Sequence, residues 1–300
     1  MNSGWLLLVI PGLIWGASFL FIAEGLGSIG PSGVAFVRIC FGFATLALFP
    51  SARQPVPRTA WKAVAWLGVL WFAFPLSMFP FAEQRVSSAL TGMLNGANPL
   101  FATLVAAYIL RRWPSRGVAI GLAVGLAGTI VMAIPAMSEG ESSAVGVALI
   151  LAALLSYGVA LSIARSLQQQ HGAIPVIWRA QAVGVVLTAP LGIPDLLAAH
   201  WSTGPLLSLL ALGVFGTAVA NVLMASAAGR FGAARASSTL FLIPVVALVL
   251  GVVAVRWIDR RIYTEIDFIE EVKRGNIAAA IYASVLLLFV GVILAAALAK

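Results

Sequence analysis

Three polar side chains lie on one face of a predicted helix that starts near Ser87. Thr91, Asn95 and Asn98 occupy positions i, i+4 and i+7, so one hydroxyl and two carboxamides form a row along that face. Pro99 has no N–H to donate to the Asn95 carbonyl, which leaves a backbone acceptor in the same row. Such groups can hydrogen-bond a polar ligand, and they can equally bridge one helix to the next. Both interpretations turn this face toward the interior of the molecule.

Two arginines, Arg38 and Arg179, lie inside otherwise apolar runs. A guanidinium binds a carboxylate through two parallel hydrogen bonds, so either residue could hold the carboxylate of a zwitterionic ligand. The alternative is structural, because a long arginine side chain can reach the edge of an apolar layer or anchor a neighbouring helix.

Aromatic residues form the third candidate group. Trp15, Tyr157 and Trp178 could stack on a ligand or shape its site, although large aromatic residues also pack without any ligand. Met78 and Phe79 lie in a run rich in phenylalanine. A flexible thioether beside aromatic rings suits a permissive pocket and also suits a plain hydrophobic core.

The composition indicates what surrounds these residues. Of 300 residues, 61% are hydrophobic and 9% are charged, and the mean hydropathy is +1.04. No soluble fold could bury so much apolar surface, so the sequence predicts a polytopic protein in a lipid bilayer. The net charge of +8 comes from short basic clusters between apolar runs, which signal topology and do not indicate nucleic-acid binding.

Few residues could support catalysis or bind a metal. The single cysteine, Cys40, lies in an apolar run, and the two histidines, His171 and His200, fall in predicted loops. We therefore expect no metal and no cofactor. A nucleophile and base pair is also lacking, so we do not expect an enzyme.

Apolar runs of sufficient length predict an all-α protein with ten transmembrane helices. The runs cover approximately residues 5–23, 32–50, 63–82, 87–110, 117–136, 145–164, 174–193, 205–228, 233–255 and 277–298.

Charge placement predicts the orientation. With the amino terminus in the cytoplasm, nearly all basic residues before position 255 fall inside, and Arg85 alone falls outside. The inside set is Arg53, Arg58, Lys62, Arg111, Arg112, Arg116, Arg165, Arg230, Arg235 and, at the carboxyl end, Lys300. The positive-inside rule therefore places both termini in the cytoplasm. The acids before position 255, Glu83 among them, fall at outer ends or in loops, so we expect no tight proton coupling.

The chain repeats itself. Residues 85–99 have a weaker copy 145 positions later, in which Arg230 matches Arg85 and Pro244 matches Pro99. Two further pairs lie at similar offsets: Trp15 with Tyr157, and Arg38 with Arg179. Because five helices is an odd number, the second half must enter the bilayer from the opposite side. We predict inverted repeats at 1–138 and 139–300 around a central cavity.

The helix count and the positions of Trp15-Gly16, Arg38, Asn98-Pro99 and a glycine-striped fifth helix together resemble the drug/metabolite transporter superfamily, EamA type. The resemblance covers about residues 1–255 and is greatest to exporters of amino acids and metabolites. It implies movement of small metabolites through a cavity between the halves.

The end of the chain departs from that resemblance. An atypical charged join at 257–276 contains five of the ten acidic residues of the chain, and the final segment looks like a small inner-membrane family of the DUF350 kind. Natural divergence, a fusion or a chimera would each give this pattern.

The leading hypothesis is an exporter of amino acids in a bacterial-type inner membrane, working by alternating access as a monomer or weak homo-oligomer. Its partners would be a small-molecule substrate and the bilayer, with no nucleic acid. The candidate substrate-binding residues are Trp15, Arg38, Met78, Phe79, Thr91, Asn95, Asn98, Tyr157, Trp178 and Arg179. The alternatives are a membrane scaffold without transport activity and an exporter of drugs or nucleoside-like metabolites.

Overall fold

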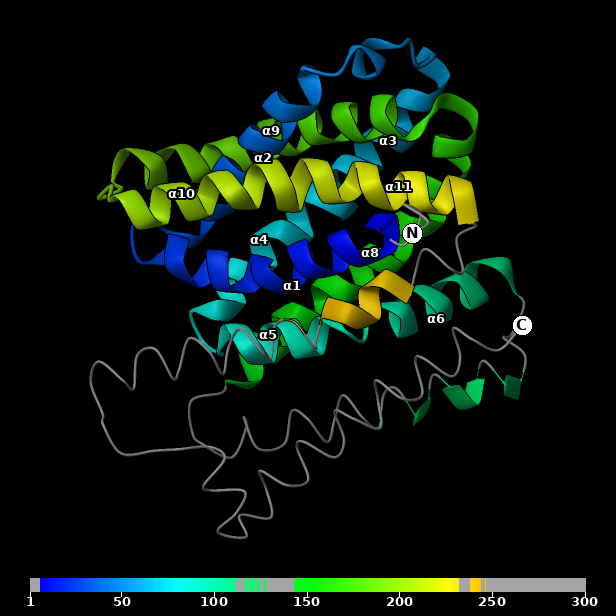
Figure 1. Cartoon of the computed structure of the whole chain (residues 1–300), viewed down its shortest axis with the longest axis horizontal. Helices are drawn as coiled ribbons and strands as arrows, with labels where there is room; N and C mark the ends of the chain where they lie inside the picture. Colours follow the sequence, from blue (N-terminus) through cyan, green and yellow to red (C-terminus); the bar gives the residue numbers. More distant parts are fainter. Residues whose placement is uncertain are drawn as a thin grey trace, which may run out of the picture.

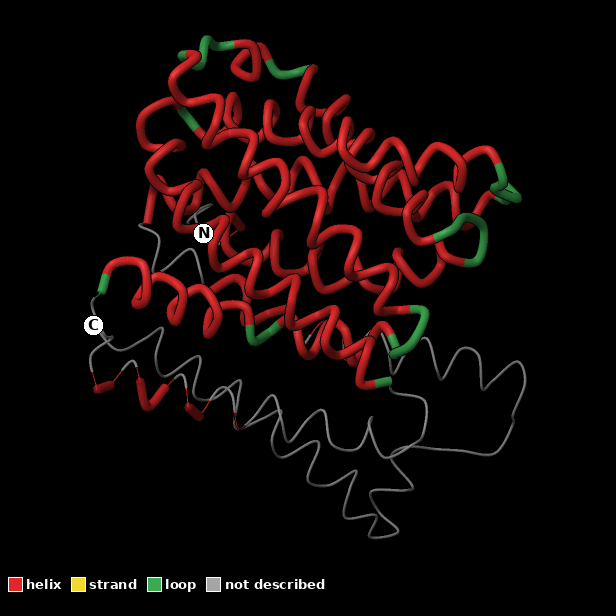
Figure 2. The backbone as a smooth tube through the Cα atoms, turned by 180° about the vertical axis from the view of Figure 1, so that it is seen from behind, coloured by secondary structure: helices red, strands yellow, loops and turns green. Residues whose placement is uncertain are grey.

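A computed structural model describes residues 6–111, 116–117, 119–121, 123–124, 127, 143–231, 238–243 and 246. Within these residues every regular element is a helix, as the backbone trace shows (Figure 2). The tenth predicted helix and the charged join at 257–276 lie outside the described residues. So do most of the fifth and ninth predicted helices.

The first half begins with two helices joined by a short turn. The elements up to the first long gap are α1 (Leu6–Leu26), α2 (Pro31–Ala47), η1 (Pro50–Arg53), η2 (Arg58–Ala60), α3 (Trp61–Leu67), η3 (Gly68–Ala73), α4 (Phe74–Glu83), α5 (Ser88–Asn95) and α6 (Asn98–Leu110). The run from η2 to α4 forms one long helical span, Arg58–Glu83.

The second half is described up to the start of its fourth helix. Its elements are α8 (Ala144–His171), α9 (Ala173–Leu197), α10 (Thr203–Ala211), η4 (Leu212–Val219), α11 (Ala220–Phe231) and η5 (Ser238–Phe241). Five described helices are long and apolar enough to cross a membrane: Leu6–Leu26, Arg58–Glu83, Ala144–His171, Ala173–Leu197 and Thr203–Ala227. The structure is thus all-α with several apolar spans, as the sequence predicts.

The predicted helix at 87–110 is interrupted near its middle. Ser87 caps α5 by accepting a hydrogen bond from the Leu90 N–H at 3.2 Å. The helix then ends at Asn95, and α6 starts at Asn98 with Pro99 in its first turn. The break follows from proline chemistry, because Pro99 cannot donate to the Asn95 carbonyl and its ring crowds the preceding turn.

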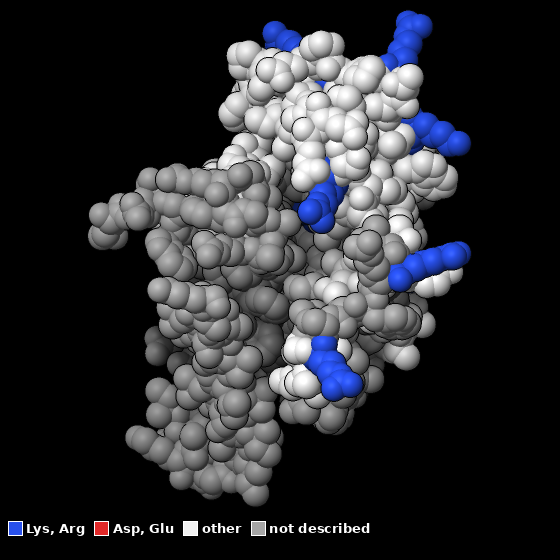
Figure 3. Space-filling view, turned by 90° about the vertical axis from the view of Figure 1, so that its right-hand side faces the viewer, with Lys and Arg blue, Asp and Glu red and all other residues white. Residues whose placement is uncertain are grey.

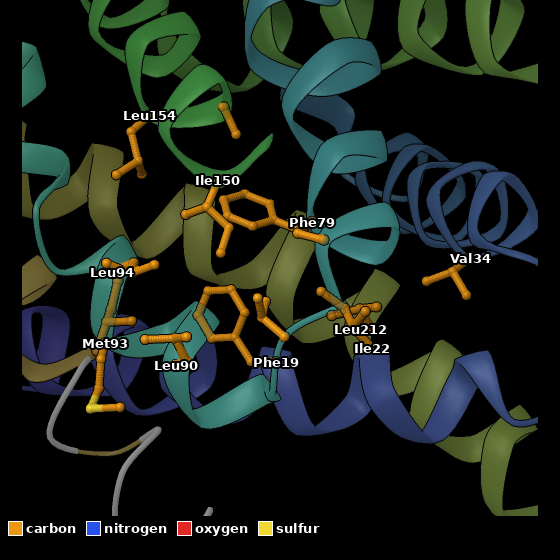
Figure 4. Packing of buried hydrophobic residues seen from close by; sticks show 14 of the residues in the cluster. Phe19, Ile22, Val34, Phe79, Leu90, Met93, Leu94, Ile150, Leu154 and Leu212 are labelled. Carbon is orange, nitrogen blue, oxygen red and sulfur yellow. The ribbon is translucent and has the colours of Figure 1, made fainter. Parts of the chain in front are cut away.

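Helices from the two halves are interleaved. In Figure 1, α2 lies along α9 in the upper layer, while α4 and α6 lie along α8 and α1 lies beside α10 and α11. One hydrophobic cluster joins α1, α4, α5 and α8, and Figure 4 shows its Phe19 and Phe79 rings turned toward each other. A second cluster joins α2, α3, α8 and α9. Each core therefore contains residues from both halves.

Described loops gather at two ends of the bundle. At one end His200 N–H donates to Ser28 O at 3.0 Å, and Ser143 N–H donates to Arg85 O at 3.1 Å. The opposite end carries η1 and η2. Figure 3 views the right-hand side of Figure 1, where α6 and α11 end, and shows basic side chains there without visible acidic ones among the described residues.

The spans Arg58–Glu83 and Thr203–Ala227 occupy equivalent positions in the two halves, and each contains a π-helical segment. η3 begins at Gly68, and Gly213, 145 residues later, is the second residue of η4. A Cβ on Gly68 would lie 2.8 Å from the Ala180 carbonyl oxygen, and a Cβ on Gly213 would lie 2.9 Å from that of Arg38. Each glycine thus allows its π-segment to touch the backbone of a helix from the other half, and the two contacts are related by the repeat.

Candidate functional site

Arg38, on α2, belongs to a buried group of polar side chains that come from several helices. Its side chain is 4% exposed, and its Nε donates to Thr217 Oγ1 at 3.2 Å. This is the only hydrogen bond that the described residues give it, so both terminal nitrogens are unengaged there. A guanidinium in this state can bind a carboxylate with both of its outer nitrogens.

Thr217 joins Arg38 to the π-segment η4. Its Oγ1 donates to Leu212 O at 3.1 Å, while its own carbonyl accepts from Gln181 Nε2 at 2.8 Å and Asn221 Nδ2 at 2.9 Å. A π-turn leaves carbonyls without their usual i+4 partners, and these side chains satisfy one of them. The network holds α2, α9 and η4 together within the membrane-spanning region.

Aromatic residues predicted from the sequence pack beside Arg38. Phe79 contacts Phe19 edge to face at a centroid distance of 5.6 Å and lies 6.1 Å from the Tyr157 ring. Tyr157 is within Coulombic range of Arg38, and Met78 packs against the same hydrophobic cluster. Side chains from α1, α4 and α8 therefore pack together, and Tyr157 relates them to Arg38 on α2.

Trp15 links α1 to the second half. Its Nε1 donates to Gly216 O, a π-segment carbonyl, at 2.9 Å. A Cβ on Gly216 would lie 2.9 Å from Ser18 Oγ and 3.8 Å from an Arg38 terminal nitrogen. Trp15 thus belongs to the neighbourhood of Arg38, with its indole N–H already bonded to the backbone.

Glu83 is the residue that the sequence analysis placed at an outer end and did not select. It does end α4, yet both carboxylate oxygens are buried and have no hydrogen-bond partner among the described residues. The carboxylate lies within Coulombic range of Arg38. Burial of the last turn of α4, where Ala82 is fully buried, removes water that an outer end would normally have.

Thr91, Asn95 and Asn98 are all buried, as their spacing predicts. Thr91 Oγ1 donates to Ser87 O at 3.0 Å within its own helix. The side-chain carbonyls of Asn95 and Asn98 have no hydrogen-bond partner in the described part of the chain. The row therefore offers two open acceptors, and no described residue uses them as an inter-helix bridge.

Trp178 and Arg179 lie apart from the other candidates, toward the end of the bundle that carries η1. Trp178 stacks on Phe43 at 5.2 Å with an interplanar angle of 4°, and the Arg179 guanidinium lies 5.6 Å from the Trp178 ring centroid. Arg179 Nη1 donates to Ala52 O and Pro175 O, each at 3.1 Å. Arg179 thus hydrogen-bonds the backbone of η1, the segment that follows α2. The structure does not place Arg179 beside Arg38.

The site as a whole combines a buried guanidinium, a buried carboxyl group and hydrogen-bonding side chains, so it can bind a charged ligand. The described residues contain no group of three or more metal-ligating side chains. Thr217, Gln181 and Glu83 were missed from the sequence. For the first two a signal existed, since each is a hydrogen-bonding residue inside a long apolar run. A described pocket near Ala107 and Tyr108 includes no candidate residue.

Comparisons with known proteins agree on one family. The sequence model of the EamA-like transporter family matches residues 2–134 and again 144–257. A probable terminal-alkyne amino-acid exporter of Streptantibioticus cattleyicolor is 25% identical over 252 residues, covering 82% of this chain and 83% of its own. The uncharacterized transporter YdfC of Bacillus subtilis is 25% identical, covering 79% of this chain and 78% of its own. One crystal structure superposes with a TM-score of 0.63 at 18% identity over 100% of both chains, a likeness of fold alone.

Proposed function

Because this chain belongs to the EamA-like transporter family, we propose that it exports amino acids. Membership of the family makes it a multi-pass membrane transporter of small molecules and not an enzyme. Cargo would pass between two inverted five-helix halves, residues 1–138 and 139–300, by alternating access. The membrane would be a bacterial-type inner membrane, with both termini in the cytoplasm.

One observation carries the choice of cargo. Arg38 is buried within the bundle, bonded only through Nε, with its two terminal nitrogens unengaged among the described residues. An isolated buried cation is costly, and such residues in membrane proteins commonly serve substrate or ion binding. A carboxylate on the cargo would supply the missing partner. The similarity to the Streptantibioticus protein, a probable terminal-alkyne amino-acid exporter, supports the same choice.

The position of Arg38 also supports alternating access. Its single hydrogen bond reaches Thr217, so the cation of one half is held by a side chain of the other. Of the repeat-related π-segments, η4 packs against α2 and η3 packs against α9. Irregular backbone next to a site shared by two repeats is typical of secondary transporters.

Counterflow in proteoliposomes tests the proposal. Vesicles containing the purified full chain and unlabelled leucine should accumulate labelled leucine from outside, and Arg38→Gln should reduce the initial rate at least ten-fold. The exposed Arg53→Gln variant is the control and should transport as the unmodified protein does. If the unmodified protein exchanges none of the twenty amino acids, the proposal is wrong and export of drugs or nucleoside-like metabolites takes its place.

A further inference from the structure

The Glu83 carboxyl group is buried without a hydrogen-bond partner among the described residues. Both of its carboxylate oxygens are buried and lack a hydrogen-bond partner there. A buried carboxylate without donors loses its hydration and gains little in return, so proteins normally pair such a group with a cation. Arg38 interacts electrostatically with this carboxyl group, but no hydrogen bond or ion pair joins the two side chains.

Arg38 shows the complementary deficiency. Thr217 occupies its Nε and fixes the direction of the guanidinium, while the terminal nitrogens hydrogen-bond no described residue. The bundle therefore holds one carboxyl group without a described hydrogen-bond partner and one incompletely paired guanidinium that interacts with it electrostatically, with no hydrogen bond between the two.

Aromatic residues lie near these two groups. Phe79 precedes Glu83 by one helical turn, so both lie on the same face of α4. Its ring contacts Tyr157, which is itself within Coulombic range of Arg38. A ligand that reached both charges would thus place any remaining group against aromatic surface, which suits an aliphatic or aromatic side chain.

We infer that Glu83 and Arg38 bind the two ends of one zwitterion, the α-ammonium at Glu83 and the α-carboxylate at Arg38. This inference rests on the proposed amino-acid transport and adds to it a residue and a selection rule. Cargo must carry a free ammonium and a free carboxylate on the same carbon atom. Ligands that lack either charge leave one buried group unpaired, which weakens their binding by an order of magnitude or more.

A different role for Glu83 makes the opposite prediction. If the residue were a protonated, uncharged acid, glutamine would imitate it, and leucine binding would survive the substitution Glu83→Gln. If Glu83 only oriented Arg38, its loss would weaken every ligand with a carboxylate to the same degree. Three probes separate these roles: leucine, N-acetylleucine, which lacks the ammonium, and leucinamide, which lacks the carboxylate.

The experiment measures binding of the three probes to the purified full chain by calorimetry. The unmodified protein should bind leucine at least ten-fold more tightly than either analogue, a comparison that requires no variant to fold. Glu83→Gln should weaken leucine binding at least ten-fold and leave N-acetylleucine within two-fold. Arg38→Gln should weaken leucine and N-acetylleucine and leave leucinamide within two-fold.

The control is Glu24→Gln, since Glu24 is an exposed acid in the last turn of α1 and its loss should change no affinity. Unchanged leucine binding by Glu83→Gln, or equal losses for leucine and N-acetylleucine, would overturn the inference while leucine counterflow still upheld amino-acid transport. Absence of both leucine binding and counterflow in the unmodified protein would overturn the transport proposal and this inference with it.

Discussion

At the scale of single residues, the candidate site depends on one contact between the halves, in which Arg38 Nε donates to Thr217 Oγ1 at 3.2 Å. Arg38 stands out because a cation in an apolar run is expensive, and the structure does bury it. Its partner Thr217 lies 179 positions away, and nothing local relates the two. For Glu83 the prediction from sequence is incomplete. Its position at a helix end predicts a solvated carboxyl group, whereas the burial of its oxygens depends on how α4 packs.

The Arg38 to Thr217 contact leads to a prediction about positioning. Thr217→Val keeps the volume and removes the oxygen that accepts from Arg38 Nε, so the guanidinium loses its fixed direction. We expect the half-saturating leucine concentration in counterflow to rise about three- to ten-fold with little change in maximal rate, and Thr217→Ser to restore it.

Thr188→Val is the matched control for this prediction. Thr188 is also buried, but its hydroxyl donates only within its own helix, to Gly184 O at 2.8 Å and Val185 O at 3.4 Å. An equal loss in both variants, or no rescue by serine, would mean that Thr217 contributes packing alone.

At the scale of elements, hydrophobic run length locates the spans to within a few residues. The run predicted at 174–193 becomes Ala173–Leu197, and that at 63–82 becomes Arg58–Glu83. The π-segments η3 and η4 are not predictable in the same way. Hydropathy is insensitive to whether a carbonyl bonds four or five residues ahead, and that choice depends here on Gly68 and Gly213 approaching another helix.

Those two glycines give a prediction for the elements. A Cβ on Gly213 would lie 2.4 Å from Phe41 Cβ, and one on Gly68 would lie 2.5 Å from Val183 Cβ, in addition to the carbonyl contacts. Backbone oxygens cannot move aside cheaply, so Gly68→Ala and Gly213→Ala should each destabilise the protein by about 1–3 kcal/mol.

Thermal unfolding of the purified variants measures this. Both should unfold several degrees below the unmodified protein, whereas Gly121→Ala, whose Cβ would meet no atom of the described residues within 4 Å, should not. Because the two sites are related by the repeat, stability lost at only one of them would contradict the equivalence of η3 and η4.

At the scale of the whole molecule, the family and the repeated organisation follow from sequence pattern, since two family matches cover most of the chain. The interleaving of the halves does not. Internal repeats show that two units exist, but the pairing of α2 with α9 and of α4 with α8 is set by the shapes of packed side chains. The contact between Arg38 and Thr217 could not be predicted from the sequence for the same reason, because the two residues come together only when the halves are interleaved.

Orientation in the membrane is the last whole-molecule prediction. Exposed basic residues Arg53, Arg58 and Lys62 lie at the end of the bundle that carries η1 and η2, and short basic loops remain in the cytoplasm. Replacing Cys40 gives a thiol-free chain for single-cysteine labelling with a membrane-impermeant reagent. Cysteine at Ser202, exposed in the loop before α10, should react in intact cells, and cysteine at Thr59, exposed in η2, should react only after permeabilisation. Labelling of the Thr59 position in intact cells would show that the orientation is the opposite of the predicted one. The end of the bundle near Arg38 and Glu83 would then face the cytoplasm, and the proposed direction of transport would be reversed.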